Sequence, residues 1–337
     1  MRLHRPRILV VGSFMMDLIA STSRAPQSGE TVLGEKFSTA PGGKGANQAV
    51  QCARLGAKVT MAGRVGNDEF GRRMVDTARQ AGVDVSHVQL DSEEPSGVGH
   101  ITLEHNQAGT HNRITVLPGA NHRMKPEDLQ WLHDEIGNFE MLMLQLELPM
   151  DVTLAAAACA KEAGVPVMLN PAPAAPLPPE LLRCVTYLSP NEHEAALLTG
   201  HPISITEGKA DPKDIQTVLQ RLRSQAAGGC QGCIITLGER GSVLADEEGI
   251  CMVPCVPAPQ VADPTAAGDS FVAAFCTALC AGMDRCQAML FASYTASLTV
   301  SRMGAMPSLP TVQEVQQLLL QRGEKEIDPT CLEPLIH

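Results

Sequence analysis

Short apolar runs alternate with longer stretches of helical periodicity along most of the chain. The first run, residues 8–13, ends in Gly-Ser and is typical of a buried strand. From Pro126 onward the order is helix, strand, helix, strand, with strands expected at residues 141–146 and 165–169 and a helix at 152–163. Strands that alternate with crossover helices form a parallel sheet covered by helices on both faces. The pattern therefore predicts a doubly wound α/β fold.

The same periodicity predicts further elements on either side of this core. A proline-rich stretch at residues 171–179 is expected to be a loop inside the domain, because the alternation resumes directly after it. Three helices that start near Ala267, Asp284 and Val312 close the chain. The remaining expected strands are residues 59–65, 185–189 and 233–237 and two that flank a turn at 246–249, and the remaining expected helices are residues 45–55, 68–80, 126–136, 192–198 and 215–225.

Two early segments do not follow the α/β alternation. Residues 97–104 and 113–117 are rich in β-branched side chains and are expected to form a hairpin around a polar turn. Residues 31–38 alternate weakly, as an edge strand does. We therefore expect a single domain over all 337 residues, with a small β-sheet lid formed by segments at about 15–41 and 97–118.

Composition limits the kinds of partner. The 337 residues are 44% hydrophobic and 19% charged, which is typical of a globular protein with a sizeable core. A formal net charge of −11 argues against nucleic acid or an anionic membrane surface, and one Trp and two Tyr leave no aromatic platform for bases. An acidic protein binds an anion such as ATP through local devices, such as helix N-termini and backbone amides.

The eleven cysteines favour a reducing compartment. The pairs Cys230 and Cys233, and Cys251 and Cys255, have spacings that also occur in zinc sites, but they overlap apolar strand-like runs. Zinc ligands usually lie on turns, so free thiols are the favoured interpretation. The basic N-terminus only superficially imitates a signal peptide, and no run approaches the ~20 apolar residues of a membrane span. We predict a cytoplasmic protein without nucleic-acid or membrane partners.

Residues 263–271 follow a predicted strand and open a helix of small residues. Ala266, Ala267 and Gly268 let a ligand approach the backbone, where the free N–H groups of a helix start can hold a phosphate. Asp269 lies in the same first turn. A carboxylate there can simply stabilise the helix end, but that role does not need the small residues before it. Amides beside one carboxylate supply the anion site and the base that phosphoryl transfer to an alcohol requires.

Two motifs resemble the signatures of the ribokinase-like (PfkB) carbohydrate kinases. They are residues 263–269 (DPTAAGD) and residues 42–49 (GGKGANQA), and their order and spacing are those of the family. Matching blocks run nearly end to end, from residues 10–13 (VVGS) to residues 304–308 (GAMPS). The resemblance implies a doubly wound α/β domain with a β-sheet lid and ATP-dependent phosphorylation of D-ribose at O5.

The resemblance also implies the catalytic and sugar-binding groups. Asp269 is the implied base, and the backbone amides of Ala266, Ala267 and Gly268 are the implied anion hole. Asp17 and Glu147 come just after predicted strands, at the edge where open α/β sheets bind ligands. The implied pentose contacts are Met15, Asp17, Gly43, Lys44, Asn47, Glu147 and Asp269.

Met15 is a departure from the common ribokinase pattern, which often has Asn two residues before the sugar-binding aspartate. A thioether cannot donate a hydrogen bond to a hydroxyl, so the preference for ribose over 2-deoxyribose is open at this point. Deoxyribokinases resemble this chain in having Met here, although some ribokinases share it, and Met15 can equally be a core residue. The alternative substrates are therefore 2-deoxyribose, another furanose or a nucleoside.

The nucleotide and ion sites are implied by the same resemblance. Asn191 and Glu194 fit a helix capping box, and in the family they help to place Mg²⁺ and the phosphates. Pro264 departs from the C-terminal motif, because it removes one N–H and fixes φ in the loop. The implied ATP contacts are Asn191, Thr236, Gly238, Glu239, Arg240, Gly241, Gly268 and Ser293. The implied K⁺ site, mostly of backbone carbonyls, consists of Asp263, Thr265, Thr299, Arg302, Gly304 and Ser308.

The exposed lid sheet is expected to pair with the lid of a second subunit, which would give a homodimer. A non-enzymatic alternative is a catalytically silent sugar or nucleotide sensor, since a fold does not fix a function. The intact Asp269, Gly268 and Lys44 argue against the sensor.

Overall fold

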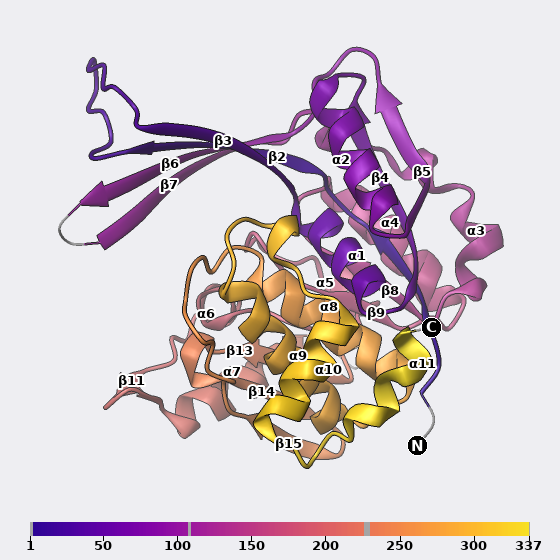
Figure 1. Ribbon diagram of the computed structural model, residues 1–337. Coiled ribbons are helices and arrows are strands. Elements are labelled where there is room, and N and C mark those ends of the chain that lie inside the picture. The colour runs from indigo at the N-terminus through magenta and orange to yellow at the C-terminus, as the bar shows by residue number, and fades with distance from the viewer. Residues whose placement is uncertain (1–2, 107–108, 226–229, 337) are drawn as a thin grey trace.

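The computed structural model describes residues 3–106, 109–225 and 230–336. A nine-stranded sheet forms the centre of the molecule, in the order β15-β14-β13-β10-β9-β8-β1-β4-β5 (Figure 1). Its pairs are parallel except β13–β14 and β14–β15, which are antiparallel and form one edge. This arrangement confirms the predicted doubly wound α/β fold. The strands are β1 (Arg7–Val11), β4 (Lys58–Gly66), β5 (Val83–Asp91), β8 (Met141–Leu144), β9 (Val167–Leu169), β10 (Tyr187–Leu188), β13 (Gly232–Thr236), β14 (Ser242–Asp246) and β15 (Gly249–Val253).

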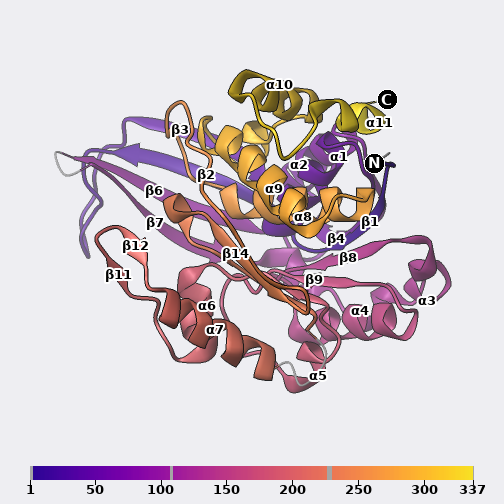
Figure 2. The same cartoon turned by 90° about the horizontal axis from the view of Figure 1, so that it is seen from below.

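Strand β1 shows how the apolar pattern produces a sheet buried on both faces. Ile8 and Val10 belong to one hydrophobic cluster, and Leu9 and Val11 belong to the other. Because successive side chains point to opposite faces, a strand that is apolar throughout needs cover on both, and Figure 2 shows helices on both sides of the sheet. One face carries α1 (Lys44–Arg54), α2 (Glu69–Gln80), α8 (Ala267–Ala281), α9 (Arg285–Val300), α10 (Val312–Arg322) and α11 (Glu333–Ile336). The other carries α3 (Leu132–Glu135), α4 (Met150–Glu162), α5 (Pro179–Leu182), α6 (Glu192–Thr199) and α7 (Pro212–Gln225).

The lid is a separate four-stranded sheet that projects from one end of the molecule (Figure 1). In the order β3-β2-β6-β7, its strands are β3 (Lys36–Gly42), β2 (Met15–Thr22), β6 (Val98–Asn106) and β7 (Gly109–Leu117). The predicted strand at residues 31–38 is wrong at its start: it followed weak alternation, whereas the pairing with β2 begins at Lys36. The hairpin is longer than predicted, since Asn106 pairs with Gly109, and residues 107–108 of its turn lie outside the described residues.

Other elements also differ from the prediction. Strand β5 was not predicted, because this partly exposed edge strand mixes valines with polar residues and has no apolar run. Residues 126–136 form the 3-10 turn η2 (Pro126–Leu129) and the short α3 in place of one helix; the buried Leu129 and Leu132 are three residues apart, which a 3-10 turn also satisfies. The hairpin of β11 (Ile205–Thr206) and β12 (Lys209–Ala210) was not predicted, because its strands are too short to show a periodicity.

The cysteines depart from the prediction at one pair. A disulfide joins Cys251 of β15 to Cys286 of α9, so the expectation of free thiols is wrong for these two. The other nine cysteines are free, and the sulfur atoms of Cys230 and Cys233 lie 3.4 Å apart. Within the described part of the chain, no helix has the length and apolar character needed to cross a membrane.

The C-terminal helix α11 packs against the end of α1. Gly56, just after α1, has φ +96°, and a Cβ there would lie 2.2 Å from the carbonyl oxygen of Leu335. The Leu335 side chain is buried in the same hydrophobic cluster as α1. The tail, for which the sequence indicates no function, therefore closes the core at this point.

Gly56→Ala should destabilise the protein more than Gly164→Ala does. Both glycines have positive φ, which costs a residue with a Cβ about 1 kcal/mol, but no atom lies within 4 Å of the Cβ position of Gly164. Gly56→Ala must also displace α11, so we expect a further loss of about 2 kcal/mol. Thermal unfolding of the two variants measures the difference, and equal melting temperatures would contradict the tight packing of the tail.

Candidate active site

The chain enters helix α8 through a left-handed residue. Ala266 has φ +62°, and among the described residues Glu207 is the other non-glycine residue with a positive φ. Such a conformation costs about 1 kcal/mol or more and persists where the surrounding structure holds it, which is common at functional sites. The buried side chains of α8, among them Val272 and Phe275, hold the helix in the core. The N–H of Ala267 donates to the carbonyl of Pro264 over 3.2 Å and closes the turn.

Asp269 lies in the first turn of α8 and is 5% exposed. Its Oδ2 accepts a hydrogen bond from Asn47 Nδ2 at 2.9 Å, and its Oδ1 accepts one from Gln48 Nε2 at 3.2 Å. Both donors lie on α1, whose entry requires Gly43: its φ is +95°, and a Cβ there would lie 2.6 Å from the backbone nitrogen of Met15. The two sequence motifs therefore meet at one carboxylate.

A cavity of about 210 Å³ lies against the start of α8. The pKa of Lys44, at its edge, is raised: burial opposes the charged form, but the carboxylates of Asp269, Glu147 and Glu194 outweigh burial. Lys44 is therefore a fixed positive charge beside the expected phosphate position. The predicted site residues that line the cavity are Lys44, Asn191, Glu194, Thr236, Ala266, Ala267, Gly268 and Asp269.

Asp17 lies on β2, at the root of the lid, and faces glycines of the neighbouring strands. A Cβ on Gly99 would lie 2.7 Å from Asp17 Oδ1, and a Cβ on Gly42 would lie 3.0 Å from Oδ2, so glycine leaves room for the carboxylate. Burial, followed by the charges of three nearby carboxylates, raises the pKa of Asp17 from 3.8 to about 7. The protein itself therefore stabilises the Asp17 charge poorly, which suits a group that receives its hydrogen bonds from a ligand.

Glu147 connects the two sides of the site. Its Oε2 accepts hydrogen bonds from the hydroxyl of Ser13 and, at 2.9 Å, from the backbone N–H of Lys44. Ser13 lies between β1 and the lid strand β2, and Lys44 starts α1. The carboxylate thus holds the start of α1 against the chain that leads into the lid.

The predicted capping box at the start of α6 is confirmed. Asn191 Oδ1 accepts from the N–H of Glu194, and Glu194 Oε2 accepts from the N–H of Asn191, both at 2.8 Å. Burial raises the pKa of Glu194, although the Asn191 N–H and the Lys44 charge oppose this shift. Thr236, at the end of β13, pairs with Asn191, which brings the ends of two neighbouring segments to the same cavity.

Other predicted nucleotide contacts lie away from this cavity. The Arg240 guanidinium pairs with both carboxylate oxygens of Glu192 at 2.9 Å. Ser293 Oγ accepts from the N–H of Val256 at 3.1 Å, and the side chain of Glu239 is 91% exposed. The predicted nucleotide contacts absent from the cavity lining are Gly238, Glu239, Arg240, Gly241 and Ser293. The predicted sugar contacts Met15, Asp17, Gly43, Asn47 and Glu147 are absent from it as well.

The predicted cation residues lie on the loop before α8 and on a second segment, from the last turn of α9 to the 3-10 turn Met306–Ser308, and the two are joined by Asp263. Its carboxylate accepts from the N–H groups of Thr265 and Gly304, each at 2.9 Å. The side chains of three other predicted residues have protein partners: Arg302 with Glu314 at 2.6 Å, Thr299 with Ser270 at 2.7 Å and Ser308 with the Ala305 carbonyl at 2.7 Å. A cation there would therefore rely mainly on backbone oxygens.

Sequence reasoning missed two polar residues of the cavity, Asn170 and Ser189. Each directly follows a strand, β9 or β10, so the rule about strand ends that singled out Asp17 would have found them. It also missed Gln48, which lies inside the N-terminal motif. A glutamine on a buried helix face has no chemical signature in the sequence, and its contact with Asp269 becomes visible only in three dimensions.

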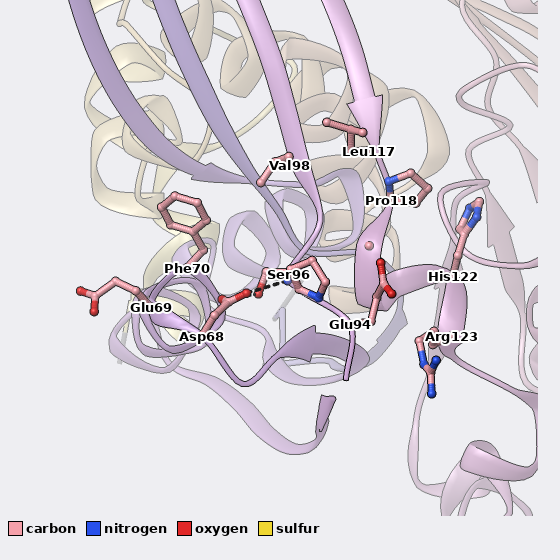
Figure 3. A pocket seen from close by; sticks show the side chains of 12 residues that line it. Asp68, Glu69, Phe70, Glu94, Ser96, Val98, Leu117, Pro118, His122 and Arg123 are labelled. Carbon is pink, nitrogen blue, oxygen red and sulfur yellow. Dashed lines mark hydrogen bonds between the residues drawn. The ribbon is translucent and has the colours of Figure 1, made fainter. Parts of the chain in front are cut away.

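A second cavity, of about 690 Å³, lies at the root of the lid (Figure 3). On β6, Gly99 faces Asp17, and the adjacent Val98 therefore points to the opposite face of the lid, into this second cavity. Phe70 and Leu117 form further parts of its wall. None of the predicted catalytic residues lines it, so the smaller cavity is the candidate active site.

Comparisons with known proteins show which proteins this chain is similar to. Residues 5–312 match the pfkB family carbohydrate kinases. The ribokinase of Bacillus subtilis is 38% identical over 312 residues, which cover 93% of this chain and 99% of that protein. The ribokinase of Mus musculus is 36% identical over 309 residues, which cover 90% of this chain and 91% of that protein. The solved structure of Arabidopsis thaliana ribokinase complexed with ribose and ATP has a TM-score of 0.84 and 33% identity, and the match covers 94% of this chain and 99% of that one.

Asp17→Asn should raise the stability of the protein, and more so at high pH. The free energy of unfolding that Asp17 contributes is fully present below its ordinary pKa of 3.8. It is lost as the pH rises through about 7, because the carboxylate must then be ionised in the folded protein. The neutral amide of Asn carries no such cost. We expect the melting temperature of Asp17→Asn to exceed that of the unsubstituted protein by roughly 2–5 °C at pH 8 and by less than half as much at pH 5. A difference that calorimetry finds to be independent of pH would exclude the ionisation of Asp17 as its cause.

Proposed function

This chain belongs to the pfkB family of carbohydrate kinases, and on that premise we propose that it transfers the γ-phosphoryl group of ATP to O5 of D-ribose. The observation that carries the proposal is the convergence of the buried Asp269 carboxylate, the start of α8 and the Lys44 ammonium on one cavity. Ribokinases match nearly the whole chain, and the similar Arabidopsis protein is complexed with ribose and ATP.

In the proposed reaction Asp269 is the base. Phosphoryl transfer needs a proton acceptor at the attacking hydroxyl and positive potential at the transferred group. Asp269 accepts the O5 proton, while the backbone amides of Ala266, Ala267 and Gly268 and the positive end of α8 stabilise the γ-phosphate. Lys44, which lines the same cavity, adds a positive charge.

The pentose is proposed to lie between the lid and the core. Asp17 and Glu147 accept hydrogen bonds from its hydroxyls, and Gly43, Lys44 and Asn47 supply close backbone approach and donors. Because Asp17 is on the lid strand β2, movement of the lid over the sugar would exclude water and limit the hydrolysis of ATP.

The nucleotide is proposed to lie over the start of α8, with Asn191 and Thr236 at its phosphates and Ser293 and residues 238–241 farther along. Mg²⁺ fits this cavity, because Glu194 offers one carboxylate and the ion usually takes its other oxygens from phosphates and water. When bound, the ion neutralises phosphate charge. Since Glu239 is exposed and Arg240 is paired with Glu192, the backbone of residues 238–241 would make the contacts.

K⁺ is the proposed activator at the two segments joined by Asp263. The segments suit a cation, because the guanidinium of Arg302 is directed to Glu314 and brings no free positive charge to them. Backbone oxygens of Asp263, Thr265, Thr299, Arg302, Gly304 and Ser308 are the proposed ligands. A bound monovalent cation would add positive potential beside the start of α8.

The proposed assembly is a cytoplasmic homodimer that forms through the lids. Ile114 and Val116 of β7 are 55% and 51% exposed and alternate onto one face of the lid. This is the face of Asp17, because Val116 pairs with Gly99 and Gly99 pairs with Asp17. Contact between two lids would bury these side chains and cover the sugar site.

A second candidate substrate is 2-deoxyribose, and Met15 favours it. Met15 is 4% exposed, and its sulfur lies 3.8 Å from Asn121 Nδ2. A thioether offers no donor to a hydroxyl, so this position gives a 2-hydroxyl little advantage. Another furanose or a nucleoside would use the same chemistry, whereas a silent sensor would not need the arrangement of Asp269 and Lys44.

Asp269→Asn should lower kcat by roughly 10³-fold, because the amide cannot accept the hydroxyl proton. Binding of ATP should change by less than about threefold, since the amides at the start of α8 remain. Initial rates of ADP release and titration calorimetry with ATP measure the two quantities. Undiminished turnover of Asp269→Asn would overturn the assignment of the base.

ADP release should be faster with ribose than with 2-deoxyribose, and K⁺ should accelerate both reactions relative to the same concentration of a large organic cation. A coupled assay with each sugar, with and without K⁺, measures this. Faster release with 2-deoxyribose would move the assignment to the second candidate. The absence of release with either sugar would contradict both and favour another substrate or a sensor.

A further inference from the structure

Helix α1 presents three amide side chains to the start of α8. Asn47 is 5% exposed, and Gln48 and Gln51 are fully buried. Residues 47, 48 and 51 lie on one face of the helix, because three or four residues make one turn. A buried amide is costly unless it is hydrogen-bonded, so the partners of each amide indicate what the helix face is arranged to hold.

The amide of Gln48 is bonded at both ends. Its Oε1 accepts a hydrogen bond from Gln145 Nε2 at 2.6 Å. Its Nε2 donates to Asp269 Oδ1 at 3.2 Å and to Asn170 Oδ1 at 3.3 Å. Because a donor occupies the oxygen end, the nitrogen end must face Asp269, and the amide cannot be reversed without loss of these bonds.

The partners of Gln48 are held by the central sheet. Asn170, just after β9, donates through Nδ2 to the carbonyl of Ser189 at 2.8 Å, so its Oδ1 faces Gln48. Gln145, just after β8, lies against Gly12, where a Cβ would be 2.3 Å from Gln145 Oε1. The Asn170 amide, held by the Ser189 carbonyl, therefore fixes the direction of the Gln48 amide dipole, whereas Gln145 Oε1 has no hydrogen-bond partner among the described residues.

We propose that Gln48 is a positioning residue for phosphoryl transfer, which holds the Asp269 carboxylate in the orientation in which it takes the sugar proton. The inference rests on the function proposed above. Asn47 donates to one carboxylate oxygen and Gln48 donates to the other, so the carboxylate cannot rotate without losing a bond.

Gln48 acts through Asp269 rather than on the substrate. It is fully buried and does not line the cavity, so it does not reach a ligand bound there. Loss of Gln48 should therefore affect the chemical step and leave the binding of sugar and nucleotide nearly unchanged.

Gln48→Met tests the role, and Gln51→Met is its matched control. Gln51 is equally buried one turn along α1, but its amide bonds the Pro310 carbonyl at 2.9 Å and the Ser270 hydroxyl at 3.1 Å. We expect Gln48→Met to lower kcat with ribose roughly 10- to 100-fold, with KM for ribose and ATP within about threefold. Gln51→Met should keep kcat within about threefold. Equal losses of kcat in both variants would overturn the inference.

The pH profile separates positioning from general damage. In Gln48→Met the acid side of the kcat profile should move to higher pH, because a donor to the ionised base is lost. Gln48→Glu keeps the shape of the side chain but places a second carboxylate beside Asp269. Because two such groups share a proton, the acid side of the kcat profile should move further in Gln48→Glu than in Gln48→Met. It also provides the test if Gln48→Met does not fold. An acid side unmoved in the folded variants would overturn the inference.

NMR of protein with ¹³C-labelled aspartate provides a readout without turnover. Asp269→Asn identifies the Asp269 carboxyl signal by its disappearance. At fixed pH the chemical shift of this signal should differ between Gln48→Met and the unsubstituted protein, because one hydrogen bond to the carboxylate is lost, and it should be unchanged in Gln51→Met. If the unsubstituted protein does not phosphorylate ribose, the proposed function fails while the NMR comparison still decides the role of Gln48. An unchanged chemical shift in Gln48→Met would overturn the inference and leave the proposed function intact.

Discussion

The hydrogen bond from Asn47 to Asp269 joins the starts of two helices that lie 222 residues apart in the sequence. A carboxylate that is almost fully buried must find its donors within the protein, and those donors come from a single face of α1. This requirement fixes how α1 approaches α8. It also determines where the cavity lies, because Lys44 starts α1 and Ala266 to Gly268 start α8. The lid follows from the same contact, since Gly43 at the entry to α1 lies against the backbone of Met15 at the beginning of β2.

The sequence was informative where structure is determined locally or by a simple period. The apolar run of β1 predicts burial on both faces, and the small residues before Asp269 predict a helix start that accepts an anion. It was uninformative where long-range packing decides. Arg240 pairs with Glu192, 48 residues away, and nothing in either local sequence indicates that pairing. The contact of Gln48 with Asp269 was missed for the same reason. The partners of Gln48, Gln145 and Asn170, follow two different strands, so its orientation depends on residues far away in the sequence. The partly exposed β5 was missed because half-burial leaves a weak pattern.

The electrostatics of the site divide its acidic groups into two kinds. The Asp269 and Glu147 carboxylates accept hydrogen bonds from the protein, so the fold itself solvates them. Asp17 is different, because burial and neighbouring carboxylates both oppose its charge. The Lys44 ammonium balances part of this negative charge and is itself stabilised by it. The site therefore stores unfavourable electrostatic free energy at Asp17, where a ligand with several hydroxyl donors would relieve it.

Asp17 belongs to the lid and Asp269 belongs to the core, and only a short segment around Ser13 joins β1 to β2. A sugar that contacts both carboxylates binds only those molecules in which the lid lies over the core. Its observed affinity is then its affinity for the closed form multiplied by the fraction of molecules that are closed. Neither carboxylate lines the cavity at the root of the lid, whose wall includes Val98 and Leu117 of the lid and Phe70 of α2, so a change of lid angle would alter this cavity. Substitutions there can strengthen or weaken sugar binding through the closed fraction alone, so homologous chains can diverge in affinity while every residue that contacts the sugar stays the same.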